Sequence, residues 1–83
     1  MKILYFAWVR ERTGRAEEDI DVPADVATVG ELIGWLKSRG PEFEHAFTDA
    51  AVIRAAIDRI HVKHDARLAG AGEIAFFPPM TGG

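Results

Sequence analysis

Residues 28–41, TVGELIGWLKSRGP, carry the clearest helix signal in the chain. The strands predicted on either side of this stretch can be placed relative to its helix. Thr28 and Glu31 have the spacing of a capping box, in which each side chain satisfies an unpaired amide at the start of a helix. Apolar residues then recur at helical spacing and form one stripe: Val29, Leu32, Ile33 and Leu36. Gly40 and Pro41 are expected to end the helix. The stretch predicts one main amphipathic helix that packs one face on a core.

Upstream of this helix, the sequence predicts two antiparallel strands. Residues 2–9 (KILYFAWV) are rich in β-branched and aromatic types, and Gly14 marks a turn before a second strand near residues 18–23. Strand alternation places two apolar sets on opposite faces: Ile3, Tyr5, Ala7 and Val9 on one, and Leu4, Phe6 and Trp8 on the other. Because both faces are apolar, we expect a central strand, with helices over both faces or another protein against one of them.

Downstream, residues 73–77 (EIAFF) predict a strand that Pro78 and Pro79 end, since proline cannot donate to a sheet ladder. Residues 42–49 suit a short helical turn or a loop, and residues 52–58 (VIRAAID) fit a helix or a strand equally well. This order of elements predicts an α+β fold, with one helix on one face of a mixed sheet. We expect a single domain over residues 1–83, in which residues 78–83 form a flexible tail.

Composition excludes several classes of function. The 83 residues are 48% hydrophobic and 28% charged with a formal net charge of -3, which is typical of a globular domain and unfavourable for binding nucleic acid. No apolar run approaches the roughly 20 residues that span a bilayer, so we expect no membrane partner. The absence of cysteine excludes disulfides and thiolate metal sites. The apolar run at residues 3–9 is too short for a signal peptide, which favours a cytoplasmic location.

Side-chain chemistry is sparse. Ser38 is expected to be a solvated hydroxyl, and His61 with His64 lacks a recognised metal-ligand spacing, so no metal site is predicted. The carboxylates of residues 17–21 (EEDID) are interpreted as a solvated sheet edge rather than an acid/base pair. Residues 70–73 (GAGE) precede a strand and lack a phosphate-loop lysine, so they predict a turn.

The chain ends on residues 76–83, FFPPMTGG. Two glycines present a backbone carboxylate with no Cβ near it, so this end could enter a channel too narrow for side chains, while the prolines stiffen its base. Residues 80–83 span about 13 Å when extended, enough to reach into a neighbouring active site. Adenylation by ATP would make the Gly83 carboxylate reactive, and a sulfur nucleophile would convert it to a thiocarboxylate. The alternative is a frayed end without function.

Three segments carry a resemblance to a known family. The runs FAWVRERTG (residues 6–14), TVGEL (28–32) and EIAFFPPMTGG (73–83) resemble the small subunit of molybdopterin synthase, a ubiquitin-like sulfur carrier. The resemblance covers essentially the whole chain and implies a β-grasp fold in which residues 52–58 form a strand. It also implies that Gly83 is adenylated by a ubiquitin-activating-enzyme-like adenylyltransferase that consumes ATP, and that a sulfur donor protein then supplies the sulfur.

The resemblance further implies how the sulfur is used. The tail would thread into the large synthase subunit through Pro78, Pro79, Met80, Thr81 and Gly82, and Gly83 would give its sulfur to the pterin precursor in molybdenum cofactor biosynthesis. The chain would be a non-catalytic subunit with no bound cofactor, in a heterotetramer with two copies of each subunit. The resemblance thus implies that the partner proteins, rather than side chains of this chain, supply the catalytic groups for thiocarboxylate formation and sulfur transfer.

Matching positions imply that Phe6, Arg10 and Phe77 contact the partners. The alternatives are that both phenylalanines belong to the core and that Arg10 only braces its loop. The chain departs from the family at Asp58, where asparagine is common, and at residues 70–73, where Asp-Gly-Asp-Glu is common. These departures concern turn geometry and partner electrostatics.

Other functions share parts of this pattern. A sulfur carrier for thiamine-type thiazole synthesis would be shorter and lack the Phe-Phe-Pro-Pro run. A ubiquitin-like protein modifier would use the same activated Gly-Gly end to form isopeptide bonds with lysines. In a non-catalytic interaction domain, both terminal glycines would be dispensable.

Overall fold

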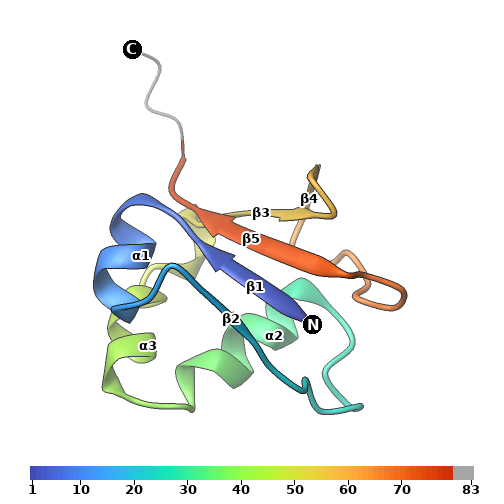
Figure 1. The fold of residues 1–83 in the computed structure, drawn as a ribbon, viewed down its shortest axis with the longest axis horizontal. Coiled ribbons are helices and arrows are strands. Elements are labelled where there is room, and N and C mark those ends of the chain that lie inside the picture. The colour runs from blue at the N-terminus through green and yellow to red at the C-terminus, as the bar shows by residue number, and fades with distance from the viewer. Residues whose placement is uncertain (80–83) are drawn as a thin grey trace.

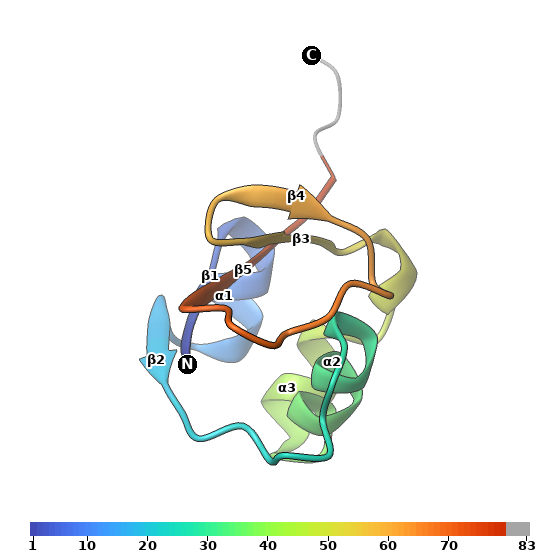
Figure 2. The same ribbon diagram turned by 90° about the vertical axis from the view of Figure 1, so that its right-hand side faces the viewer.

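The computed structural model describes residues 1–79 and shows a five-stranded mixed sheet with its helices on one face (Figure 1, Figure 2). The elements follow the chain as β1 (Lys2–Tyr5), α1 (Ala7–Thr13), β2 (Glu17–Asp19), α2 (Val29–Lys37), α3 (Pro41–Ala46), the 3-10 turn η1 (Ala50–Val52), β3 (Arg54–Ile57), β4 (Ile60–Val62) and β5 (Glu73–Phe77). The strands lie in the order β2-β1-β5-β3-β4. The predicted α+β class is confirmed, and the undecided segment at residues 52–58 contains a strand.

The central strand β5 runs parallel to its neighbour β1, and every other pair in the sheet is antiparallel. Every second side chain of a strand points toward the helices. On β1 and β5 the side chains that do so are almost fully buried: Ile3, Tyr5, Ile74 and Phe76. The helices and the segment after α3 supply the opposite wall of the core: Val9, Val29, Leu32, Leu36, Phe43 and Phe47. One apolar layer between sheet and helices therefore holds the domain together.

The predicted strand over residues 2–9 is wrong beyond Tyr5. The Phe6 amide donates to the Phe76 carbonyl (3.0 Å) and extends the β1–β5 ladder by one bond. Ala7 then adopts a left-handed φ of 52° and begins α1, so its side chain is exposed rather than on the inner face of a strand. Val9 and Thr13 lie one helical turn apart and are both buried. Burial of this helical pair outweighs the strand preference of the individual residue types.

The connection between β1 and β2 is consequently a helix rather than a tight turn. Gly14 follows α1 with a φ of 77°, and its amide donates to the Arg10 carbonyl (3.0 Å), as a glycine C-cap does. The two strands are antiparallel neighbours as predicted. The second of them, however, covers Glu17–Asp19 rather than residues 18–23.

The main helix α2 begins as predicted. The Thr28 hydroxyl accepts from the Glu31 amide (3.2 Å), and the Glu31 carboxylate accepts from the Thr28 amide (3.1 Å). Its predicted apolar stripe is buried. The helix ends at Lys37, three residues before Gly40, because Pro41 starts the separate helix α3. Helix α2 lies close to the segment after β4, where the Gly30 amide donates to the His64 carbonyl (2.8 Å) and a Cβ at Gly30 would lie 3.4 Å from the same oxygen.

Within residues 1–79, no helix has the length and apolar character needed to cross a bilayer. The described residues also contain no cluster of three or more His, Asp or Glu side chains suited to a metal ion.

Candidate functional site

The base of the tail lies at the end of the central strand β5. Residues 78 and 79 leave the sheet beside the junction of β1 and α1 (Figure 1). Both prolines are half-buried, and neither can donate a further ladder bond. The predicted threading and reactive residues Met80, Thr81, Gly82 and Gly83 lie outside the described residues. What the structure describes is therefore the platform from which the tail departs.

The face of the sheet opposite the helices carries no covering element within residues 1–79 (Figure 2). We call it the open face, and strand alternation assigns it these residues: Lys2, Leu4, Phe6, Glu17, Asp19, Arg54, Ala56, His61, Glu73, Ala75 and Phe77. Its middle is small and apolar, because Leu4 lies beside Ala75 and Ala75 beside Ala56. Neighbouring side chains nearly cover both alanines, which are 7% (Ala56) and 9% (Ala75) exposed, so the exposed apolar area of this face lies mainly at its tail end.

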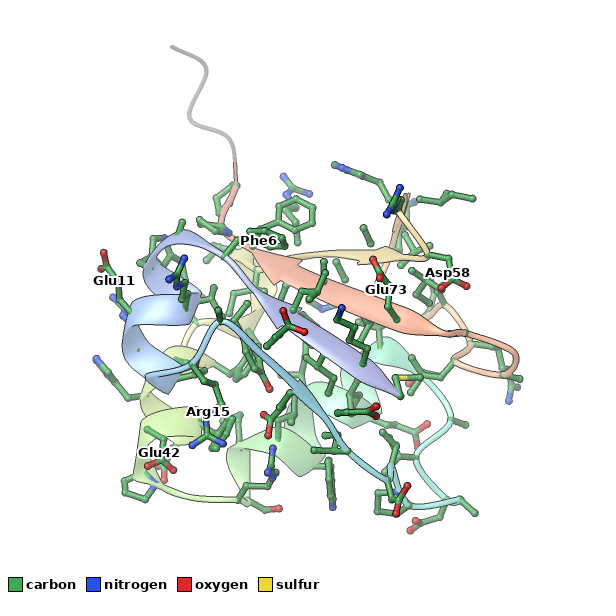
Figure 3. All side chains as sticks on the ribbon, in the orientation of Figure 1. Phe6, Glu11, Arg15, Glu42, Asp58 and Glu73 are labelled. Carbon is green, nitrogen blue, oxygen red and sulfur yellow. The ribbon has the colours of Figure 1, made fainter. Side chains whose placement is uncertain are left out.

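Phe6 and Phe77, both predicted to contact partners, are brought together at the tail end of the open face. The register Tyr5 to Phe76 puts them at adjacent positions of neighbouring chain segments. Phe6 is 48% exposed and lies near the base of the tail (Figure 3), so it is not a core residue. Phe77 is half-buried. Aromatic side chains are enriched in protein interfaces, so this partly exposed pair suits contact with a partner.

Arg10 lies on α1, one helical turn after Phe6, and is exposed. Its backbone carbonyl accepts hydrogen bonds from the Gly14 amide (3.0 Å) and the Thr13 hydroxyl (3.3 Å). These two hydrogen bonds stabilise the C-terminal end of α1. Among the described residues, no hydrogen bond or ion pair engages its guanidinium group. The loop is thus braced by the Arg10 backbone, and the side chain is free to meet a partner.

Sequence reasoning missed the charged residues beside Phe77. Arg54 lies opposite Phe77 in the β3–β5 ladder, and the His61 ring packs against the Phe77 ring with centroids 5.1 Å apart. Lys63 follows β4 on the same side of the molecule and lines a hollow together with Arg54. Residues 54 and 56 alternate along a strand, so the sequence would have placed Arg54 and Ala56 on one sheet face if residues 52–58 had been predicted as a strand. Their own pattern fitted a helix equally well, and the position of Arg54 beside Phe77 was therefore missed.

The interpretation of the carboxylates at residues 17–21 as a solvated edge is wrong for Glu18. Alternation turns Glu18 under β2, where its side chain is only 13% exposed. It accepts hydrogen bonds from the Tyr5 hydroxyl (2.7 Å) and from Arg39 (2.9 Å), and Arg15 lies 3.3 Å away. Burial by itself raises the pKa of Glu18, but these bonds and positive charges lower that pKa more, to below its ordinary value.

This cluster stabilises the fold. Burial, followed by the bond to Glu18, raises the pKa of the Tyr5 hydroxyl far above its ordinary value, so the hydroxyl stays protonated. The Tyr5 ring also lies in the core beside Phe76 and Phe43. The cluster ties β1, β2 and the loop after α2 together on the helix side of the sheet, away from the open face.

Three other side chains considered as candidates make separate contacts. Ser38 is exposed and donates to the Trp35 carbonyl (2.6 Å). The His64 ring contacts the Ile53 carbonyl (2.8 Å), whereas the His61 ring packs on Phe77, so these two imidazoles do not converge. The turn predicted at residues 70–73 contains Gly70, whose φ is 81°.

The two departures from the family pattern contact each other. Asp58 and Arg59 form the two-residue turn between β3 and β4, with φ values of 47° and 72°. The Asp58 carboxylate accepts from the amides of Gly72 (3.1 Å) and Glu73 (3.0 Å), as its position beside Glu73 in Figure 3 illustrates. A Cβ at Gly72 would lie 3.4 Å from this carboxylate. Asp58 is therefore compatible with a small, uncharged residue at position 72. Its carboxylate binds the amides at the start of β5 and thereby stabilises the turn.

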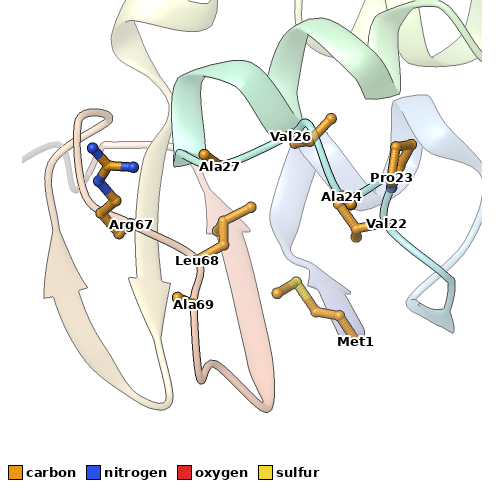
Figure 4. A pocket seen from close by; sticks show the side chains of 9 residues that line it. All are labelled: Met1, Val22, Pro23, Ala24, Val26, Ala27, Arg67, Leu68 and Ala69. Carbon is orange, nitrogen blue, oxygen red and sulfur yellow. The ribbon is translucent and has the colours of Figure 1, made fainter.

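A shallow pocket of about 290 Å³ lies at the other end of the sheet, next to the start of β1 (Figure 4). It is lined by Met1, Val22, Pro23, Ala24, Val26, Ala27, Arg67, Leu68 and Ala69. Because β1 and β5 are parallel and the tail follows the end of β5, this pocket is remote from the tail base.

Comparisons with known proteins identify the family. Residues 3–83 match the ThiS family. The chain belongs to the ThiS family. It is 36% identical over 83 residues to the molybdopterin synthase sulfur carrier subunit of Escherichia coli, covering 100% of this chain and 99% of that protein. It is 33% identical over 82 residues to the protein of the same name from Dictyostelium discoideum, covering 99% and 94% of the two chains.

Solved structures show the same fold as this ThiS-family chain. SAMP1 from Haloferax volcanii superposes with a TM-score of 0.75 at 27% identity, over 100% of this chain and 98% of that one. A candidate molybdopterin converting factor, subunit 1, from Pyrococcus furiosus gives a TM-score of 0.72 at 29% identity, over 94% of both chains. The β-grasp fold and the resemblance expected from the sequence motifs are confirmed.

Proposed function

We propose that this ThiS-family chain is the sulfur carrier subunit of a molybdopterin synthase, with the Gly83 carboxylate as its reactive group. The observation that carries this proposal is the match, over nearly full length, to two proteins that are named as such subunits. The architecture supports it, because the central strand β5 delivers Pro78 and Pro79 to one end of a face that has no covering element in residues 1–79.

The chemistry occurs in two transfers to and from the end of the chain. A Gly83 carboxylate oxygen attacks the α-phosphorus of ATP in a ubiquitin-activating-enzyme-like adenylyltransferase, and pyrophosphate leaves. Sulfide-level sulfur from a donor protein then attacks the acyl carbon and displaces AMP, which leaves a thiocarboxylate. ATP is consumed by the activating enzyme, and the carrier itself holds no cofactor.

Delivery occurs in the large subunit of the synthase. The tail, through Pro78, Pro79, Met80, Thr81 and Gly82, enters the large subunit, and the Gly83 thiocarboxylate gives its sulfur to the pterin precursor. Phe6, Arg10 and Phe77 contact the partner around the base of the tail. Two copies of each subunit form the complex, and the components meet in the cytoplasm.

The carrier is non-catalytic in this proposal. Among the described residues, the groups with a displaced pKa are Tyr5, Glu18 and Arg39, and these bind one another beneath β2. These three side chains therefore stabilise the fold. This supports a role in which the catalytic groups come from the partner proteins.

The proposal is tested by mass spectrometry of the intact protein. The chain is incubated with ATP, a sulfur donor and the adenylyltransferase from the same organism, and a chain lacking Gly83 is the control. We expect the full chain to gain the mass difference between sulfur and oxygen, in an ATP-dependent manner. Covalent attachment to lysines of other proteins would instead identify a modifier, and delivery only to a thiazole synthase would identify a thiamine-type carrier.

A further inference from the structure

The two ends of the open face differ in how their charged side chains are paired. At the end remote from the tail, Lys2 is paired with Glu17 (3.2 Å), and Glu73 and Asp58 add two carboxylates. At the tail end, the adjacent positions Phe6 and Phe77 are followed across the sheet by Arg54. The tail therefore leaves beside an aromatic pair whose next neighbour is a cation.

A second cation joins Arg54 at this border. The pairing of Ala55 with Val62 puts Lys63 next to Arg54 in the continuation of the β3–β4 ladder. The two residues line one hollow of about 300 Å³, together with Ala51, Ile53, Val62 and His64. Both side chains belong to exposed residues. We call Arg54 and Lys63 the cationic border.

The cationic border has no counter-charge within the described residues. No carboxylate of residues 1–79 lies within 4.0 Å of either side chain, whereas Glu18 alone binds two arginines on the helix side. The chain as a whole is acidic, with a net charge of -3. Two neighbouring cations without partners on an acidic molecule mark where an acidic surface would dock in one orientation.

The border cannot act on the reacting end of an extended tail. Six residues, 78–83, span about 20 Å when extended, so the Gly83 carboxyl group would lie far beyond the reach of Arg54. The border must instead meet whatever surrounds the base of the tail. Charges at such a rim mainly set the association rate and the orientation of docking.

We propose that Arg54 and Lys63 pair with carboxylates around the tail entrance of the synthase large subunit, next to an apolar recess that receives Phe6 and Phe77. This inference rests on the proposed function and specifies the chemistry of its partner. The border steers the carrier so that the tail faces the entrance before the aromatic pair is buried.

The test compares two double variants that make the same change in net charge. Arg54→Glu with Lys63→Glu reverses the border, and Arg59→Glu with Arg67→Glu reverses two exposed arginines outside it. Association with the purified large subunit is measured at about 0.1 M and about 1 M salt, where the Debye length falls from about 10 Å to about 3 Å. Circular dichroism checks that every variant is folded.

Reversal of the border should weaken binding about tenfold or more at low salt, mostly through the association rate, and less than about threefold at high salt. The control should stay within about twofold of the wild-type chain at both salt concentrations. Arg54→Gln with Lys63→Gln should give an intermediate loss. Equal effects of the border and control variants, or no effect of either, would overturn the inference while leaving the sulfur-carrier function intact. If the wild-type chain itself failed to bind the large subunit, the proposed function would be wrong, and the inference with it.

Discussion

At the scale of single residues, Ala7 is the position where backbone geometry matters most to the site. Its φ of 52° turns the chain from β1 into α1 and leaves the preceding Phe6 exposed beside the tail base. A left-handed backbone costs most residues about 1 kcal/mol or more, and it is worst for β-branched side chains. The turn is therefore maintained by its surroundings, in particular by burial of Val9.

This geometry predicts the effect of substitutions at Ala7. Ala7→Val should lower the free energy of unfolding by about 1–3 kcal/mol, since a branched Cβ resists this φ. Ala7→Gly should leave it within about 1 kcal/mol of the wild-type value, because the relief of strain offsets the greater freedom of the unfolded chain. Denaturant unfolding measures both, with Ala16→Val as a control at an exposed position of ordinary φ. Equal losses from the two valine variants would contradict the assignment of strain to Ala7.

Glu18 predicts how stability depends on pH. Because its pKa in the folded state lies below the ordinary value of 4.5, its contribution is present above that pH and is lost as the pH falls below it. Glu18→Gln should cost about 1–3 kcal/mol near neutral pH, since a charged hydrogen-bonding partner of Tyr5 and Arg39 is lost.

The same variant should lose less stability than the wild-type chain when the pH is lowered to about 3. Thermal unfolding across this range measures the difference, and Glu44→Gln is the control on the exposed side of α3. An acid dependence of Glu18→Gln that parallels the wild-type curve would show that the Glu18 cluster does not contribute to acid sensitivity.

At the scale of secondary-structure elements, the turn of the β3–β4 hairpin contains one residue that suits its backbone conformation and one that does not. Both turn residues have positive φ, as in the type I′ turn that favours Asn-Gly or Asp-Gly. Asp58 suits the first position and binds the amides of residues 72 and 73, but Arg59 has a Cβ where glycine is preferred.

We therefore expect Arg59→Gly to stabilise the protein by about 0.5–1 kcal/mol, which raises the melting temperature by several degrees in a domain of this size. Arg59→Ala removes the same charge but keeps the Cβ, so it should not stabilise. Differential scanning calorimetry distinguishes the two. Stabilisation by alanine as large as that by glycine would assign the effect to charge rather than to backbone conformation.

The elements also show which parts of the fold could be predicted. Helix α2 is encoded locally, because its capping box and apolar stripe lie within ten residues of each other. The end of β1 is not, since the bond from the Phe6 amide to Phe76 and the burial of Val9 join segments about 70 residues apart or depend on packing. The glycine C-cap at Gly14 was the local sign of α1, and it was interpreted as a hairpin turn.

At the scale of the whole molecule, the sequence motifs predicted the family, whereas the strand register revealed the surface around Pro78 and Pro79. Phe6, Arg10 and Phe77 were named from matching positions, and the structure brings Phe6 and Phe77 together. Arg54 and Glu18 were missed, because the meaning of each depends on the strand beside it. The strand register shows that the Glu18 side chain lies on the helix side of the sheet and that Arg54 lies on the open face.

The division between platform and tail predicts that tail variants retain the fold. Gly82→Val should unfold at the wild-type temperature, because residues 1–79 contain the sheet and its core. It should nevertheless deliver sulfur slowly, since a branched side chain next to the reactive end would crowd a narrow channel. A loss of thermal stability comparable to that of a core variant would contradict this separation.

The central claim is tested most directly by a single turnover of sulfur delivery. Carrier that holds a thiocarboxylate at Gly83, verified by its mass, is mixed with the large subunit and the pterin precursor, and both carrier and pterin are followed by mass spectrometry. We predict that the carrier exchanges its sulfur for oxygen as the pterin acquires sulfur, with two carriers consumed for each dithiolene formed. A pterin that acquires sulfur while the carrier keeps its own, or delivery at an unchanged rate by a chain lacking Gly83, would contradict the account.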